Sequence, residues 1–188
     1  MNKMKNIVVG VCGGIACYKA VEIVNQLKKD GYNVNVIMTK SAQEFVRPLT
    51  FQVMSGNIVV TDMFDPIDHW DTTHIDLAKN ADLFVIVPAT ANVIGKIASG
   101  IADDMLTTTV MVAKCPVLIA PAMNSAMYEN AFVQTNISKL TDNGYKVLKT
   151  KEGLLACGDE GQGKLLDWEE IVKEIKESIE KENKYLRS

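Results

Sequence analysis

The sequence predicts an α/β protein built on a doubly wound parallel sheet with helices on both faces. Continuous apolar runs of strand length stand at residues 6–12, 81–87 and 117–120, as expected of strands that are buried on both faces. Segments with apolar residues at helical spacing separate these runs, and strands that alternate with helices favour a parallel sheet. The 188 residues suit one domain spanning residues 1–188, which is long enough to bury a substantial core.

The first part of the chain predicts a βαβ unit. After the strand at residues 6–12, a helix with one apolar face is closed by Gly31, because glycine readily adopts the left-handed conformation that ends helices. Residues 33–39 alternate enough to form a second strand, and Ser41 is placed to cap a helix that ends before Pro48. An irregular segment, residues 56–73, follows.

The second part of the chain continues the alternation. The strand at residues 81–87 is closed by Pro88, and the helix that follows the strand at residues 117–120 ends at Gly144. The further elements are helices at residues 92–98 and 103–113, a strand at 145–148 and a glycine-rich loop at 153–163. The last helix starts with a capping box of Asp167 and Glu170. Its apolar face consists of Ile171, Ile175 and Ile179.

The composition argues against several classes of function. The chain has a net charge of −3, and 6% of its residues are aromatic. No lysine and arginine cluster is free of interleaved acidic residues, so neither a nucleic-acid surface nor a base-stacking platform is predicted. No apolar run is long enough to span a membrane. Gly10, Gly13 and Gly14 interrupt the N-terminal apolar run, which is interpreted as a core strand rather than a targeting segment.

The four cysteines show neither disulfide-like nor metal-like spacing. Cys12, Cys17 and Cys115 lie in or beside apolar segments, whereas Cys157 lies in a polar, glycine-rich loop. Reduced thiols in a cytoplasmic protein are the natural interpretation, with the first three as packing residues. The two histidines lie five residues apart, and no flanking pattern predicts a metal site.

The turns after the first two strands predict a phosphate site. Backbone N–H groups at Gly13-Gly14 and at the helix that follows can face an anion, although a tight turn without a ligand is an equally good explanation of two glycines. The second strand leads into Thr39, Lys40 and Ser41, without the acidic residue that binds an adenosine ribose in dinucleotide sites. Hydroxyls and a lysine there suit the terminal phosphate of a mononucleotide such as FMN.

Further polar segments are expected at the same edge of the sheet. They comprise residues 88–92, 99–104 and 121–124. Ligands of open α/β sheets bind beyond the carboxyl ends of the strands, so Asn124 is well placed to contact one. Taken alone, Asn124 is better explained as the cap of the next helix. The agreement of several segments on one edge favours a ligand.

Two residues outside these turns are candidates for catalysis. His74 carries an imidazole, the usual general base of enzymes, although a loop histidine is most often a surface residue. Cys157 lies in a loop of the kind that often closes over a ligand.

Several motifs in order resemble the flavin-containing cysteine decarboxylases. They are Gly13-Gly14, Thr73-His74, and residues 88–92, 121–124 and 156–159. The resemblance covers nearly the whole chain. It implies a Rossmann-like, flavodoxin-like three-layer sandwich that forms a homotrimer or a multiple of trimers, with FMN between subunits. The function that it implies is FMN-dependent decarboxylation of 4′-phosphopantothenoylcysteine to 4′-phosphopantetheine and CO₂ in coenzyme A biosynthesis.

The resemblance also implies roles for individual residues. Those expected to hold FMN are Gly13, Gly14, Ile15, Thr39, Lys40, Ser41, Thr90, Ala91, Asn92, Val93 and Ala122. His74 would be the base, Asn124 would bind the carboxylate and amide of the substrate, and Cys157 would donate a proton. Leu154 and Ala156 would line the substrate under the loop. No metal is expected.

The implied chemistry avoids the unstabilised carbanion that direct loss of CO₂ from a cysteine carboxylate would leave. Oxidised FMN would accept a hydride from the carbon bearing sulfur, and the resulting thioaldehyde would take up the electrons released when CO₂ leaves. Reduced FMN would return the hydride while Cys157 supplies a proton, so that the flavin ends oxidised. Asn124, as a neutral amide, would position the carboxylate without the strong ground-state stabilisation of an arginine.

Two departures and three alternatives accompany the resemblance. Related sequences commonly have serine in place of Gly14, and many bacterial members continue into a synthetase domain that is not expected beyond Ser188. The alternatives are a peptidyl-cysteine decarboxylase of lantibiotic maturation, a flavin prenyltransferase and a non-catalytic flavin-binding regulatory protein. The loop that contains Cys157 argues against the first alternative, and His74 together with Cys157 argues against the second. A regulatory role stays open.

Overall fold

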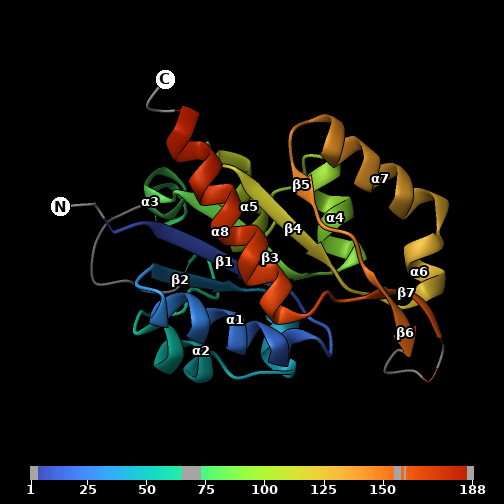
Figure 1. Ribbon diagram of the computed structural model, residues 1–188, viewed down its shortest axis with the longest axis horizontal. Helices are drawn as coiled ribbons and strands as arrows, with labels where there is room; N and C mark the ends of the chain where they lie inside the picture. The colour runs from blue at the N-terminus through green and yellow to red at the C-terminus, as the bar shows by residue number, and fades with distance from the viewer. Residues whose placement is uncertain (1–3, 65–72, 155–157, 159, 186–188) are drawn as a thin grey trace.

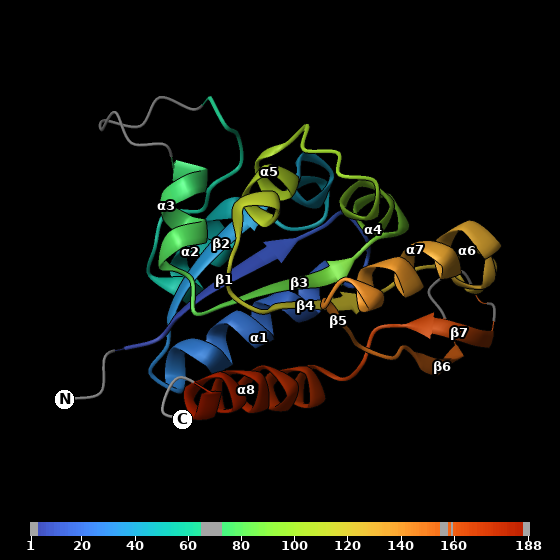
Figure 2. The ribbon, with the colours of Figure 1, turned by 90° about the horizontal axis from the view of Figure 1, so that it is seen from above.

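The computed structural model describes residues 4–64, 73–154, 158 and 160–185. A five-stranded sheet lies between two layers of helices (Figures 1 and 2). Its strands are β1 Asn6–Val11, β2 Asn33–Met38, β3 Leu83–Ala89, β4 Val117–Pro121 and β5 Lys146–Val147. A separate two-stranded sheet consists of β6 Lys151–Leu154 and β7 Glu160–Lys164. The helices are α1 Cys17–Lys29, η1 Lys40–Glu44, α2 Pro48–Ser55, α3 Thr73–Asn80, α4 Ala91–Ala98, α5 Met105–Val112, α6 Ser125–Glu129, α7 Ala131–Asp142 and α8 Trp168–Tyr185.

The five strands are parallel and follow the order β2-β1-β3-β4-β5. Val9 of β1 is paired with Val36 of β2 on one side and with Val85 of β3 on the other. The chain therefore reverses its direction of winding at β1, as the sequence predicts. Such a switch point leaves a crevice at the carboxyl ends of the strands, where ligands of this architecture bind.

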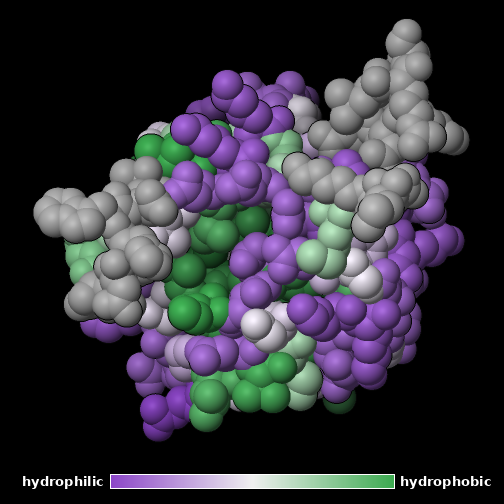
Figure 3. Space-filling view, turned by 90° about the vertical axis from the view of Figure 1, so that its left-hand side faces the viewer, coloured by the Kyte–Doolittle hydropathy of each residue, from purple (hydrophilic) through white to green (hydrophobic). Residues whose placement is uncertain are grey.

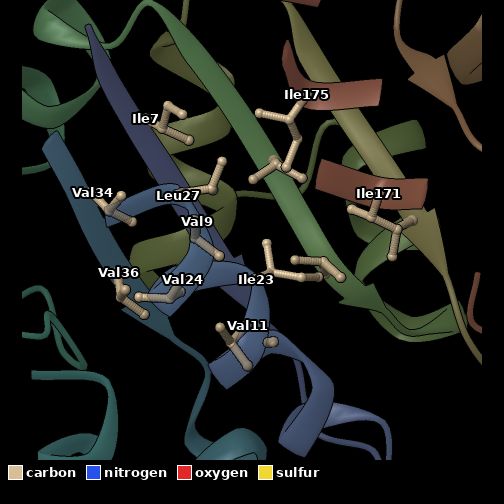
Figure 4. Packing of buried hydrophobic residues seen from close by; sticks show 14 of the residues in the cluster. Ile7, Val9, Val11, Ile23, Val24, Leu27, Val34, Val36, Ile171 and Ile175 are labelled. Atoms are coloured by element: carbon tan, nitrogen blue, oxygen red, sulfur yellow. The ribbon is translucent and has the colours of Figure 1, made fainter. Parts of the chain in front are cut away.

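Helices α1 and α8 cover one face of the sheet (Figure 2). Figure 4 shows how their side chains meet those of the strands: Ile7, Val9, Val11, Val34 and Val36 from β1 and β2, with Ile23, Val24, Leu27, Ile171 and Ile175 from the helices. All of these side chains are fully buried, and each contributes about 1.5–3 kcal/mol relative to exposure. The predicted apolar face of the last helix is confirmed, because Ile171, Ile175 and Ile179 are buried.

Helices α4 and α5 cover the opposite face. Phe84 and Ile86 of β3 pack there against Ile94 of α4 and Leu106 of α5. Asp104 caps α5 in a capping box, since its carboxylate accepts a hydrogen bond from the Thr107 N–H at 2.8 Å. Among the described helices, none combines the length and the apolar character needed to cross a membrane.

Three helical predictions change in the structure. The helix predicted before Pro48 is the short 3-10 helix η1, and Thr39 rather than Ser41 caps it, because the Thr39 hydroxyl accepts from the Ala42 N–H at 3.3 Å. Helix α2 then begins at Pro48 itself, where a missing N–H costs no intrahelical bond. The sequence pattern does not predict α3, which places His74 on a helix and not in a loop.

Three other predictions also change. The strand predicted to close at Pro88 runs to Ala89, with a register shift against β4 after Ile86, where Pro88 has no N–H to donate. Residues 99–104 connect α4 to α5 and do not follow a strand. The predicted glycine-rich loop at 153–163 contains parts of the antiparallel pair β6–β7, which its glycines conceal because they are rare in strands.

Candidate active site

A pocket of about 940 Å³ lies at the carboxyl ends of the strands. Its wall is formed by the turns after β1, β2, β3 and β4, by the α4–α5 connection and by the β6–β7 hairpin. Single ligand pockets usually measure about 300–1,000 Å³. The volume is therefore large enough for a planar cofactor together with a small substrate.

The first turn is packed against the second through Gly13. A Cβ atom at Gly13 would lie 2.4 Å from the Cβ of Ser41 and 2.7 Å from its backbone carbon, so only glycine allows this approach. A Cβ atom at Gly14 would meet nothing within 4 Å, which leaves the backbone there open toward the pocket. The N-terminus of α1 follows directly, and its N–H groups favour an anion.

Two threonines hold the neighbouring turns in place. The Thr39 N–H donates to the Val11 carbonyl at 3.0 Å, which ties the second turn to the end of β1. Thr90 caps α4, because its hydroxyl accepts from the Val93 N–H at 3.4 Å. The two caps fix the backbone on which Lys40 and Asn92 stand, and both of these side chains line the pocket. The resulting wall offers hydroxyls, a lysine and helix N-termini, which suit a planar cofactor with one terminal phosphate.

The turn after β4 is held by two backbone hydrogen bonds. The Ala122 N–H donates to the Ala89 carbonyl at 3.0 Å, and the Met123 N–H donates to the Gly163 carbonyl at 3.0 Å. The Asn124 amide oxygen accepts from the Ala126 N–H at 2.9 Å. The predicted cap is thus confirmed, and Asn124 also lines the pocket. A carboxamide in this position can both accept from its own helix and face a ligand.

Charged groups on the α4–α5 side of the pocket are paired with one another. The ammonium group of Lys96 lies 2.7 Å from Asp103 and 3.4 Å from Asp104. The hydrogen bond with Asp103 raises the pKa of Lys96 and lowers the pKa of Asp103. All three residues line the pocket, so this wall carries one excess negative charge.

The hairpin closes the remaining side. Leu154, Gly163, Lys164 and Leu165 line the pocket, and the Leu154 side chain is 66% exposed. Gly163 has a φ of +117°, and a Cβ atom there would lie 2.5 Å from the Met123 carbonyl oxygen. At this position, the close approach of the hairpin to the turn that carries Asn124 requires a glycine.

The structure brings most of the predicted site residues together. Every residue expected to hold FMN lines this pocket, and so do Asn124 and Leu154. Their assigned contacts with cofactor and substrate stay predictions. His74 does not line the pocket; it is half-buried on α3, at the opposite end of the molecule from the hairpin (Figures 1 and 2). Ala156 and Cys157 lie outside the described residues.

Some lining residues escape the sequence reasoning. They are Tyr18, Lys19, Lys96, Met127, Lys164 and Leu165. Lys19 and Lys164 could have been noticed, because each follows a predicted glycine-rich turn within a few residues. Lys96 shows no such signal, since only the fold brings it to Asp103 and Asp104.

The first two cysteines are core residues, as predicted. Cys12 and Cys17 are both fully buried, and the Cys17 thiol donates to the Cys12 carbonyl at 2.7 Å. Burial raises the pKa of both thiols, which disfavours the reactive thiolate.

Comparison with known proteins identifies relatives along nearly the whole chain. A family model described as Flavoprotein matches residues 1–180. The "Coenzyme A biosynthesis bifunctional protein CoaBC" of Bacillus subtilis (strain 168) is 53% identical over 169 residues, which cover 90% of this chain and 42% of that protein. The "Probable phosphopantothenoylcysteine decarboxylase" of Streptococcus mutans serotype c is 44% identical over 177 residues, which cover 93% of this chain and 99% of that protein. The chain thus spans less than half of the first relative.

A solved structure has the same fold. It is a cysteine-to-serine mutant of a PPC decarboxylase complexed with pantothenoylaminoethenethiol. The match has a TM-score of 0.83 at 26% identity and covers 93% of this chain and 97% of that chain. The predicted three-layer sandwich is confirmed by this match and by the strand order.

Proposed function

Because the chain belongs to the Flavoprotein family, we propose that it is an FMN-dependent decarboxylase. Its substrate would be 4′-phosphopantothenoylcysteine, and its products would be 4′-phosphopantetheine and CO₂, as a cytoplasmic step of coenzyme A biosynthesis. The observation that supports this most is the convergence of the predicted FMN residues and Asn124 on one pocket of about 940 Å³. The names of the relatives and of the matching structure agree with this substrate.

The residues around the first turns fit FMN. Gly13, Gly14 and the N-terminus of α1 would hold the phosphate by backbone N–H groups, with Lys40 and Ser41 as side-chain partners. The end of β2 offers no acidic residue for a second nucleoside. When bound, FMN supplies the chemistry of accepting a hydride from the carbon that bears sulfur and returning it later.

The chain's own residues would position the substrate and move protons. Asn124 would donate its amide N–H to the substrate carboxylate, while its oxygen holds the cap of α6. Leu154 would cover the substrate from the hairpin, where it lines the pocket with two-thirds of its side chain exposed. Cys157, in the same hairpin segment, would supply the proton that completes the saturated product.

His74 would reach the pocket from another subunit. In a single chain, α3 lies far from the hairpin (Figure 1), so a neighbouring chain is the simplest source of the base. Large apolar side chains remain exposed, including Phe64 at 85% and Phe132 at 81%. In Figure 3, apolar residues gather in a hollow, with hydrophilic residues beside it. Such surfaces are typical of contacts between chains, and a trimer or a multiple of trimers would provide them.

The activity is tested by supplying 4′-phosphopantothenoylcysteine to the flavin-loaded protein without an external reductant. We expect CO₂ and 4′-phosphopantetheine in equal amounts, because the flavin ends oxidised. Peptides that end in cysteine serve as the competing substrate. A preference for such peptides would favour the peptidyl-cysteine decarboxylase alternative, and turnover of neither substrate would refute the proposal.

The role of Cys157 is tested with Cys157→Ser. This variant should still release CO₂ but should accumulate the enethiol product and leave the flavin reduced, as seen in its absorbance near 450 nm, a general property of flavins. Formation of the normal saturated product would remove Cys157 from the mechanism.

The shared site is tested by co-expressing two inactive variants, His74→Asn and Asn124→Ala. If the two residues come from different subunits, random assembly leaves about a quarter of the sites with both native residues. Turnover should then recover to about a quarter of the wild-type rate per site. Activity no higher than the sum of the separate variants would place both residues in one chain.

A further inference from the structure

Two of the four lysines that line the pocket have no partner among the groups assigned so far. Lys19, Lys40, Lys96 and Lys164 all line it. Lys96 is paired with Asp103 and Asp104, and Lys40 stands between Thr39 and Ser41 on the wall proposed for FMN. Two lysines, Lys19 and Lys164, are not explained by these assignments.

Lys19 and Lys164 come from distant parts of the sequence to one side of the pocket. Lys19 lies in the first turn of α1, and Lys164 is the last residue of β7. The positive charges of both side chains interact with the carboxylate of Asp167 at the start of α8. The pKa of Asp167 is lowered mainly by its hydrogen bond with Lys151, and further by the charges of Lys19 and Lys164. Both lysines therefore line the pocket on the side where α8 begins.

Neither lysine has a carboxylate of its own. Asp167 is bonded to Lys151 at 2.5 Å, and Glu170 lies 2.8 Å from the same ammonium group. Among the described residues, the side chains of Lys19 and Lys164 form no ion pair or hydrogen bond. Both are only half exposed, so their charges are incompletely screened by solvent. A dianion bound on this side of the pocket would be attracted by both charges.

We propose that Lys19 and Lys164 form a subsite for the 4′-phosphate of the substrate. This inference rests on the proposed function. It means that these two lysines make the enzyme prefer the phosphorylated substrate to the unphosphorylated one. The cysteine end of the substrate would lie at Asn124, and the phosphate end would lie at the base of the hairpin. A pocket of about 940 Å³ has room for the FMN phosphate beside Lys40 and for the substrate phosphate between Lys19 and Lys164.

The hairpin supports a substrate subsite rather than a second cofactor contact. Lys164 directly follows Gly163, whose carbonyl accepts from the N–H of Met123, the neighbour of Asn124. Leu154, the proposed cover of the substrate, lies on the strand paired with β7. One element would therefore contact both the phosphate and the middle of the substrate.

The test compares two substrates, 4′-phosphopantothenoylcysteine and pantothenoylcysteine, which lacks the phosphate. In Lys19→Gln and Lys164→Gln we expect KM for the phosphorylated substrate to rise about tenfold each, as for loss of one charge-assisted hydrogen bond. In the double variant the rise should approach about a hundredfold. The KM for pantothenoylcysteine should change less than about twofold, and kcat should be retained.

Three controls accompany the test. Lys29→Gln removes an exposed lysine from the last turn of the same helix α1 and should leave both KM values unchanged. Lys164→Arg keeps the charge and should preserve most of the preference for the phosphorylated substrate. The FMN dissociation constant of each variant, measured by flavin fluorescence, should stay at the wild-type value.

The outcomes separate this subsite from the proposed activity. Equal losses with both substrates, or a weaker affinity for FMN, would overturn the subsite while leaving the decarboxylase intact. A wild-type enzyme that does not distinguish the two substrates would also overturn it. A wild-type enzyme that converts neither substrate would refute the proposed function and the subsite together.

Discussion

The pocket has two walls that are built in opposite ways. The first, which we call the cofactor wall because it is proposed to hold FMN, consists of turns that continue buried strands, and close backbone contacts such as that between Gly13 and Ser41 hold it in place. The second, which we call the substrate wall because it is proposed to cover the substrate, is the β6–β7 hairpin, which lies outside the main sheet (Figure 2). A few polar contacts attach it, among them the Met123–Gly163 hydrogen bond and the ion pairs of Lys151.

This difference has a physical reason. A turn between a buried strand and a packed helix cannot move without disturbing the core, whereas a hairpin with exposed hydrogen bonds can open locally at low cost. The cofactor wall is thus suited to hold one group permanently, and the hairpin is suited to admit and release a substrate. Substitutions in the cofactor wall should therefore lower the unfolding free energy most, whereas substitutions in the hairpin should mainly raise the substrate KM.

The largest effect is expected at the point where the walls meet. Asn124→Ser keeps a good N-cap for α6 but removes the carboxamide. We expect kcat/KM for 4′-phosphopantothenoylcysteine to fall about a hundred- to a thousandfold, since both N–H donors of the carboxamide, which would bind the substrate carboxylate, are lost. Flavin content should stay unchanged.

The matched variant Asn124→Ala loses the cap as well. It should show the same kinetic defect together with a loss of about 1 kcal/mol in the free energy of unfolding. If Asn124→Ser were fully active, the cap would be the only role of Asn124.

The next effect tests the rigidity of the cofactor wall. Gly13→Ala places a Cβ atom 2.4 Å from Ser41, and the flavin-free protein should lose about 2–3 kcal/mol of unfolding free energy. Gly14→Ala meets no atom within 4 Å and should stay within about 0.5 kcal/mol of wild type. Urea unfolding at equal protein concentration measures both. Equal stability of the two variants would show that the first turn can shift to make room for the added Cβ atom.

A smaller effect is expected when the same kind of clash is placed in the hairpin. Gly163→Ala puts a Cβ atom 2.5 Å from the Met123 carbonyl oxygen at a φ of +117°. Because the hairpin can shift, we expect a loss of only about 1–2 kcal/mol in unfolding free energy. The substrate KM should rise while the FMN affinity stays unchanged. Loss of flavin from this variant would contradict the separation of the two walls.

The smallest effect concerns the ion pairs at the base of the hairpin. Hydrogen bonds to Asp167 and Glu170 raise the pKa of Lys151 to about 12, and the bond with Lys151 lowers the pKa of Asp167 below its ordinary value of 3.8. The stabilisation by Asp167 is present above that value and is lost as the pH falls through its folded pKa. The stabilisation by Lys151 is present below pH 10.5 and is lost as the pH rises through about 12.

Tryptophan fluorescence reports this contact, because Trp168 directly follows Asp167. In a Trp70→Phe background, emission should change on acidification below about pH 4 and stay constant near neutral pH. Lys151→Gln should move the acid-dependent change to a higher pH, because the pKa of Asp167 loses the main cause of its lowering, and should raise KM slightly. An unchanged acid response in Lys151→Gln would show that the ion pairs do not hold the hairpin.

The sequence predicts the main sheet well and the peripheral elements poorly. Runs such as residues 7–12 are apolar throughout, because both faces of a parallel strand are buried. This pattern can be recognised without knowing which strands are neighbours. The elements around His74 and at 153–163 are short, polar or rich in glycine. They form because of contacts that the fold provides, such as the pairing of β6 with β7.

The candidate site divides in a similar way. Gly13, Thr39, Thr90 and Asn124 follow strands directly, so the rule that ligands bind beyond the strand ends places them on one edge from the sequence alone. The Lys96–Asp103 pair and the presence of both Lys19 and Lys164 in one pocket depend on how the helices and the hairpin pack. No local pattern in the sequence predicts these arrangements.

The sequence by itself determined the parallel sheet, the glycine and threonine turns at its edge and the family resemblance, because each depends on residues that are adjacent in the chain. Only the tertiary structure decided that these turns enclose one pocket, that a hairpin forms its second wall, and that His74 lies away from it. These features depend on residues that are far apart in sequence, and their positions follow from the packing of helices on the sheet.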